Sequence, residues 1–162
     1  MKKLFIATGF LLIAVSAVAD WEYSTTTDKM TSQTTTMAEV TSGESLNLTF
    51  PYNGKNYGFL TIRKHPRLGQ DVIFQVNKGQ ILCSRHRGCK INVRFDDRPP
   101  LGFEGTESAD YNPKVIFFQN PAKFIKEASA AKRILVGVTL HDNGEQTLEF
   151  TSAKPLSWGS KK

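Results

Sequence analysis

The sequence predicts a mainly β protein, an antiparallel β-sandwich or open barrel of about eight short strands with one short helix. Two patterns lead to this prediction. Apolar and polar residues alternate over short segments that end in Pro, Asn, Asp and Gly, and only the segment after Asn120-Pro121 has the apolar spacing of a convincing helix. The length of 162 residues and the 40% hydrophobic content fit one globular domain and argue against a large multidomain enzyme.

The first nineteen residues have the three parts of a secretory signal peptide. Met1-Lys2-Lys3 is a basic start, the run from Leu4 to Val15 is apolar, and Ser16-Ala17-Val18-Ala19 supplies an A-x-A cleavage site. The apolar run is shorter than the roughly 20 residues of a membrane-spanning helix, which disfavours an anchor. We expect residues 1–19 to be removed and residues 20–162 to form a single β-rich domain that is periplasmic or secreted and does not span the membrane.

The first half of this domain contains a Ser/Thr-rich segment and then strands. Ser24 to Ser42 is either a linker or an edge strand or meander, because Thr favours strands. From Ser45 the pattern has period two and places Leu46, Leu48 and Phe50 on one face. A turn and two further strands follow, at Pro51-Tyr52-Asn53-Gly54, Tyr57 to Arg63 and Asp71 to Val76.

The two cysteines, Cys83 and Cys89, are predicted to form a disulfide, because an even pair in an exported protein is oxidised. The flanking segments Gln80 to Leu82 and Ile91 to Phe95 read as the two strands of a hairpin, with the disulfide closing its tip. The spacing is not C-x-x-C, which disfavours a redox role. His86 lies inside the loop without a completing set of ligands, so a zinc site is disfavoured too.

The second half of the domain contains the helix and three more strands. Asp96-Asp97-Arg98-Pro99-Pro100 interrupts the sheet, since proline cannot donate a ladder hydrogen bond. Val115 to Phe118 is a short buried strand. Asn120 is the N-cap and Pro121 the first residue of a helix with apolar spacing, and beyond it two strands surround an Asn-Gly hairpin turn, at Ile134 to Leu140 and Thr147 to Phe150.

Charge is unevenly distributed along the chain. Residues 61–94 contain many cations against only Asp71, whereas the next stretch is acidic. Such an arrangement either steers a charged partner or pairs with itself across neighbouring strands, and self-pairing is the commoner outcome. The residues involved are Arg63, Lys64, Arg67, Lys78, Arg85, Arg87, Lys90 and Arg94, followed by Asp96, Asp97, Glu104, Glu107 and Asp110.

The residues that could carry out catalysis do not form a recognisable set. None of the common nucleophile, metalloprotease or nucleotide-binding motifs is present, and His65, His86 and His141 each lie near a turn or strand end. Asp96 and Asp97 are adjacent, so they point to opposite sides of an extended chain and fit a solvated turn better than acid–base catalysis. We therefore predict a protein that is not an enzyme and needs no cofactor or metal. The aromatic residues fit core and edge packing better than a sugar platform.

The disulfide loop is the sharpest candidate for binding. It carries Arg85, His86, Arg87 and Lys90, and a closed loop loses less conformational entropy when it engages a partner. A solvated charged loop with no partner is the alternative. An anionic envelope component or an acidic protein fits this charge, whereas nucleic acid does not, because neither the compartment nor any nucleic-acid-binding signature accompanies the pI of about 9.4.

Several short motifs are shared with small exported bacterial proteins: Trp21-Glu22-Tyr23, Asp28-Lys29-Met30, Leu60-Thr61-Ile62-Arg63, the pair Cys83 and Cys89, Val93-Arg94-Phe95-Asp96, and Phe124 to Ile134. Over most of residues 20–162 the chain resembles the type VI secretion-associated VasI-like proteins and, more distantly, the invasion-associated locus B-like proteins. The resemblance implies a predominantly β, periplasmic protein and supplies no catalytic residues.

The sequence therefore predicts a periplasmic, non-enzymatic binding protein that engages an envelope component or another protein. Three alternatives stay open: an inhibitor or immunity protein acting against a toxin, an accessory protein of type VI secretion, and, less favoured, a small envelope hydrolase that uses Asp96, Asp97 or a histidine.

Overall fold

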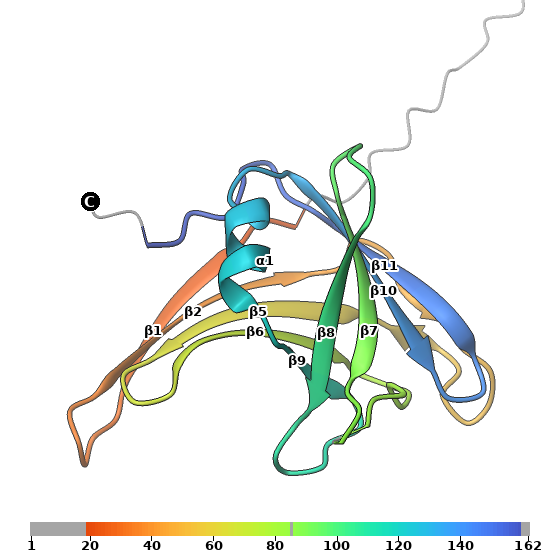
Figure 1. Ribbon diagram of the computed structural model, residues 1–162, viewed down its shortest axis with the longest axis horizontal. Helices are drawn as coiled ribbons and strands as arrows, with labels where there is room; N and C mark the ends of the chain where they lie inside the picture. The colour runs from red at the N-terminus through yellow and green to blue at the C-terminus, as the bar shows by residue number, and fades with distance from the viewer. Residues whose placement is uncertain (1–18, 85, 160–162) are drawn as a thin grey trace, which may run out of the picture.

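The part of the chain that the structure describes folds into one antiparallel sheet of nine strands, a two-stranded ladder and one helix (Figure 1). The computed structural model describes residues 19–84 and 86–159, so the predicted signal peptide lies outside the described residues except for Ala19. The elements are β1 (Glu22–Thr27), β2 (Thr34–Thr41), β3 (Leu46–Asn47), β4 (Lys55–Asn56), β5 (Gly58–His65), β6 (Gly69–Val76), β7 (Cys89–Phe95), β8 (Leu101–Glu107), β9 (Val115–Phe118), α1 (Pro121–Ala128), β10 (Arg133–Leu140) and β11 (Gly144–Thr151).

The large sheet has the strand order β1-β2-β5-β6-β9-β8-β7-β10-β11 and curves around the core (Figure 1). The curvature brings β5 against β11. The close approach is seen at Gly58, where an added Cβ would lie only 2.8 Å from Leu148 Cδ1 and 3.2 Å from Phe150 Cζ. One backbone hydrogen bond, from Gly43 N–H to the Glu149 carbonyl at 3.0 Å, also joins the end of β2 to β11. The edge strands β1 and β11 do not pair with each other. This confirms the predicted fold class.

Helix α1 forms where its start signals predict it and packs on the inner side of the sheet (Figure 1). The Asn120 side chain accepts a hydrogen bond from the Lys123 N–H at 3.1 Å, and Pro121 occupies the first turn. Phe124 is fully buried, with ring centroids 4.8 Å from Phe118 and 5.4 Å from Phe95. Aromatic packing therefore fixes the helix against β7 and β9. No helix among the described residues is long and apolar enough to cross a membrane.

The Ser/Thr-rich segment is an edge hairpin and not a linker. Its two strands, β1 and β2, pair from Glu22 with Glu39 to Thr27 with Thr34, and β2 continues into β5. Every residue of β1 is exposed. Of the two alternatives that the sequence left open, the edge strand is the one that the structure adopts.

The strand predicted from Ser45 is much shorter than its pattern indicated, and the placement of Phe50 is wrong. Only β3 forms there, because the chain turns after it: the Thr49 N–H binds the Asn143 side chain, and the Tyr52 N–H returns to the Thr49 carbonyl. Phe50 stands in this turn and is 85% exposed, whereas Leu48 is buried.

Strand β8 was missed because its apolar pattern is interrupted. The position that would carry its third inward side chain is Gly105, where a Cβ would lie 2.7 Å from Ile91 Cδ1. The Ile91 side chain therefore fills the place that a larger residue would occupy. Strand β8 pairs with β7 and β9, so Asp96 to Pro100 forms the hairpin turn between β7 and β8.

The predicted hairpin between Gln80–Leu82 and Ile91–Phe95 is also wrong. The segment 80–82 pairs with the end of β10: the Leu82 N–H donates to the Thr139 carbonyl at 2.8 Å, and Ile81 is bridged to Leu140. Strand β7 pairs with the same strand further along, where Asn92 is opposite Gly137. Residues 83–91 are therefore an excursion between two segments that run in the same direction along β10.

Candidate functional site

The disulfide between Cys83 and Cys89 is present, with an S–S distance of 2.10 Å, and closes this excursion. Inside it, the Ser84 N–H donates to the Gly88 carbonyl at 3.2 Å, and the Gly88 N–H returns to the Ser84 carbonyl at 2.6 Å. Gly88 has φ +66°, and a Cβ there would lie 2.7 Å from the Gly105 carbonyl. Only glycine fits such a position, so the loop lies closely against β8.

The predicted tip residues do not gather into one surface. Arg85 lies outside the described residues, whereas His86, Arg87 and Lys90 are exposed. Arg87 lines a hollow of about 430 Å³ together with Leu82, Pro113 and neighbouring loop residues. Lys90 instead lies in β7 opposite Glu104 and lines a separate hollow that also contains Glu145. The structure therefore groups Arg87 with other loops and separates it from Lys90.

These loops, with the disulfide loop, form what we call the loop end, made of the described residues 43–57, 77–84 with 86–90, 108–114 and 141–143. Three contacts brace it: Thr49 N–H to Asn143 Oδ1 at 2.8 Å, Ile81 N–H to the Pro113 carbonyl at 2.7 Å, and Lys78 Nζ to the Asn53 carbonyl at 2.8 Å. A further hollow of about 360 Å³ shares Pro113 with the Arg87 hollow, which makes the two neighbours; its lining also includes Pro51, Tyr52, Lys78 and Lys114.

The loop end is rich in positive charge. The described residues of its four segments include five Lys and Arg residues and three Asp and Glu residues. Two of the carboxylates have partners: the Asp142 oxygen lies 3.0 Å from His141 Nδ1, and Asp110 accepts the Ser108 hydroxyl at 2.6 Å. The hydrogen bond from Ser108, assisted by the Asn112 N–H, lowers the pKa of Asp110 and favours its ionised form.

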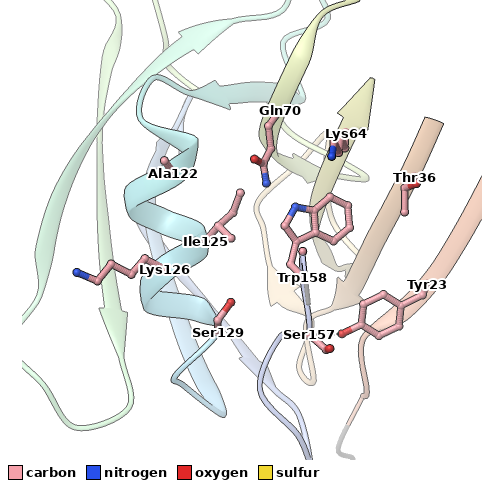
Figure 2. Close-up of a pocket in the computed structure, with 11 residues that line it drawn as sticks. Tyr23, Thr36, Lys64, Gln70, Ala122, Ile125, Lys126, Ser129, Ser157 and Trp158 are labelled. Atoms are coloured by element: carbon pink, nitrogen blue, oxygen red, sulfur yellow. Dashed lines mark hydrogen bonds between the residues drawn. The ribbon is translucent and has the colours of Figure 1, made fainter. Parts of the chain in front are cut away.

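A hollow of about 630 Å³, away from the loop end, separates α1 from the inner face of β1, β2, β5 and β6 (Figure 2). Thr36, Lys64 and Gln70 lie in one cross-strand row along its floor. Trp158 from the C-terminal segment lies across the middle of the hollow, and the Ser157 N–H donates to the Tyr23 hydroxyl at 2.8 Å (Figure 2). Sequence reasoning did not find this hollow, because strand pairing and the C-terminal segment form it together.

Two lysines, Lys64 and Lys126, line this hollow, and Lys64 is the one on its floor. The Lys126 ammonium points away from Trp158 in Figure 2, although its stem lines the space. Ser157, Trp158 and Gly159 of the C-terminal segment form part of the wall, so the volume of about 630 Å³ is the space that remains beside them.

Asp96 and Asp97 lie in the turn between β7 and β8, where Asp97 is exposed and Asp96 is half-buried, and both make contacts with the start of β10. Asp96 accepts the N–H groups of Lys132 and Arg133, both at 3.0 Å, and so fastens the β7–β8 turn to the start of β10. Asp97 forms an ion pair with Arg133 at 2.6 Å. Both carboxyl groups contact the start of β10, and neither Asp96 nor Asp97 lines any of the hollows described above.

The basic and acidic stretches pair with each other only weakly. Among the described residues, the ion pair between them is Arg94 with Asp97, at 3.9 Å. The shorter pairs involve Arg63 with Asp71, inside the basic stretch, and Arg98 with Glu127 of α1, both at 2.6 Å. Among the ion pairs of the described residues, none involves a Lys or Arg of the loop end. No group of His, Cys, Asp and Glu that could hold a metal occurs among the described residues.

Comparisons with protein-family models, curated proteins and solved structures found no match to this chain.

Proposed function

We propose that this protein is an exported, non-enzymatic binding protein of the cell envelope that engages an anionic partner through its loop end. The observation that carries the proposal is the disulfide-closed loop, which displays Arg87 beside Lys78 and Lys114 on neighbouring braced loops. The excess of cations over carboxylates in the four segments gives this end of the molecule a positive field. The signal-peptide pattern of residues 1–19 supports the compartment.

The bracing matters for binding because a surface that is already ordered loses little entropy when it engages a partner. The disulfide, the Ser84–Gly88 backbone pair and the contact of Ile81 with Pro113 hold the loops in place before any partner arrives. Long-range attraction by the cations would then raise the association rate and make binding sensitive to salt.

Charge reversal at the loop end tests the proposal. The full mature chain is applied to a sulfated-polysaccharide resin, and the salt concentration that elutes it is measured. We expect the double variant Arg87→Glu with Lys114→Glu to elute at clearly lower salt than the wild type, because two attractive contacts become repulsive.

A matched variant separates local charge from net charge. Lys29→Glu with Lys132→Glu changes the net charge by the same amount, at exposed residues of the β1–β2 turn and the α1–β10 connection. Equal elution of the two double variants would show that the loop end is not the binding surface.

A further inference from the structure

Three exposed apolar side chains project from three different loops of the loop end. Phe50 is 85% exposed, Tyr111 is 62% exposed and Leu82 is 49% exposed. The other large apolar residues that are exposed are Tyr23, in the hollow beside α1, and Met30 and Leu68, in turns at the opposite ends of the strands. Cations adjoin exposed apolar residues at both ends of the strands, since Lys29 precedes Met30 and Arg67 precedes Leu68. Among the described residues, the loop end differs in that three such side chains come from three separate loops.

Backbone contacts hold these side chains outward. Phe50 follows Thr49, whose N–H and hydroxyl both bind Asn143 Oδ1, at 2.8 and 3.1 Å. The Leu82 N–H donates to Thr139 of β10, and Leu82 directly precedes the disulfide. The loops therefore cannot easily collapse to bury Phe50 and Leu82, and the cost of exposing them to water persists in the free protein.

We propose that the loop end docks on an anionic lipid bilayer, with Phe50 and Leu82 entering the boundary between headgroups and acyl chains. This inference rests on the proposed function and names its partner. Apolar side chains that project from a cationic surface match the layered chemistry of such a bilayer, in which phosphate groups cover a hydrocarbon core. The Arg87, Lys78 and Lys114 side chains then contact lipid phosphates, while Tyr111 lies at the headgroup level that suits its polar tip.

The shape of the surface favours lipid over a protein partner. The apolar groups come from three separate loops: Phe50 from the turn after β3, Leu82 from the segment before the disulfide, and Tyr111 from the β8–β9 connection. A protein interface packs a central apolar cluster that excludes water. A bilayer accepts separate projections because its acyl chains adapt to each one.

Binding to vesicles by the full mature chain tests the inference. The vesicles contain either phosphatidylcholine alone or phosphatidylcholine with roughly one-third phosphatidylglycerol, and bound protein is measured by co-sedimentation. We expect binding to the anionic vesicles only. Phe50→Ala and Leu82→Ala should each weaken it about five- to tenfold, the factor that corresponds to partial burial of one such side chain.

Two matched variants control for apolar surface in general. Met30 is 93% exposed and Leu68 is 66% exposed, and both lie away from the loop end. Met30→Ala and Leu68→Ala should leave vesicle binding unchanged. Far-ultraviolet circular dichroism of all four variants checks that each is folded.

Insertion itself is measured with a Phe50→Trp variant and vesicles that contain brominated lipid. Bromine should quench the emission of this variant more strongly than that of the wild type, in which Trp21 is buried and Trp158 lies beside α1. Equal quenching of the two proteins would contradict insertion of this loop.

The outcomes distinguish the inference from the proposed function. Retention on the sulfated resin without vesicle binding, or vesicle binding that Phe50→Ala leaves unchanged and Arg87→Glu abolishes, would overturn membrane insertion and leave the binding of an anionic partner intact. Loss of both resin retention and vesicle binding in the wild type would overturn both proposals.

Discussion

Asp96 is a residue of the turn between β7 and β8 whose side chain makes specific contacts that stabilise the fold. It has φ +51°, in the left-handed region that Asp tolerates better than most residues, and its carboxylate accepts two backbone N–H groups at the start of β10. Asp97, by contrast, has a 90% exposed side chain with one close ion pair, to Arg133 at 2.6 Å, besides a longer one to Arg94 at 3.9 Å.

Because the two environments differ, substitutions at Asp96 and Asp97 should lower the free energy of unfolding by different amounts. Asp96→Ala should lower the free energy of unfolding by about 1–3 kcal/mol, because two N–H groups lose their acceptor and the backbone conformation becomes strained. Asp97→Ala should cost at most about 1 kcal/mol, since it removes a surface ion pair. Urea denaturation measures both, and equal effects would contradict the structural role of Asp96.

The disulfide gives a second prediction at this scale. The variant Cys83→Ser with Cys89→Ser should lower the free energy of unfolding by about 2–2.5 kcal/mol, because it releases a short closed loop in the unfolded chain. The sheet should still form, since β10 and β8 hold the segments on either side of the loop. Mass spectrometry with and without reductant establishes the bond, and urea denaturation gives the cost. Complete loss of folding would contradict this prediction.

Asp28 in the β1–β2 turn predicts a pH dependence. Its carboxylate accepts the Thr31 N–H at 2.7 Å and the Thr31 hydroxyl at 2.9 Å, and these bonds lower the pKa of Asp28. Because the pKa is lower in the folded state than in the unfolded state, this contribution to stability is complete above the ordinary Asp pKa and is lost as the pH falls through the lowered value.

Removal of the Thr31 hydroxyl isolates its part in this effect. Thr31→Val should raise the pKa of Asp28 only partway toward its ordinary value, because the backbone N–H of residue 31 still donates. Carbon NMR of the Asp28 carboxyl group across acidic pH measures the change. A pKa that is identical in the two proteins would show that the hydroxyl has no influence.

At the scale of elements, the outer edge of β1 can be deduced from hydrogen-bond alternation. The Asp28 N–H donates to the Gln33 carbonyl at the turn, so every second residue back along β1 also faces β2. The N–H and C=O groups of the intervening residues, Tyr23, Thr25 and Thr27, therefore point away from the sheet.

This alternation makes neighbouring threonines respond differently to proline. Thr25→Pro should cost less than about 1 kcal/mol, because its N–H faces solvent at a sheet edge. Thr26→Pro removes an N–H that pairs with β2 and should cost about 1–3 kcal/mol. Urea denaturation compares them, and a larger loss for Thr25→Pro would show that the deduced edge is reversed.

At the scale of the whole molecule, the curvature of the sheet depends on a close approach at Gly58. An added Cβ would lie within 3.3 Å of Leu148, Phe150 and Phe74, so β5 could not reach β11 without displacing side chains. Gly102, in β8, has no atom within 4 Å of its added Cβ and provides the matched control.

The two glycines therefore give opposite expectations. Gly58→Ala should lower the free energy of unfolding by about 1–3 kcal/mol through overpacking of the core. Gly102→Ala should be neutral or stabilise by up to about 1 kcal/mol, because it restricts the unfolded chain without a clash. Thermal and urea denaturation of the pair decide whether the close approach is as tight as the structure indicates.

The sequence by itself predicted many of the strands, the start of the helix and the disulfide, but it missed β8 and left Ser24 to Ser42 open between a linker and an edge strand. Period-two alternation predicts β5, β6, β10 and β11, and the Asn120-Pro121 start predicts α1, because these signals act between residues close in the chain. The basic character of the disulfide loop was also visible from the sequence. The sequence did not show which other loops lie beside it.

Only the tertiary structure decided which segments lie side by side. It paired Gln80–Leu82 with β10, inserted β8 between β7 and β9, and placed the Phe50 turn and Pro113 next to the Arg87 loop. Alternation of side chains tells which face of a strand is buried, but it does not identify the neighbouring strand. Strand pairing depends on contacts between residues distant in sequence, and the pairing that forms is the one that best packs the whole core.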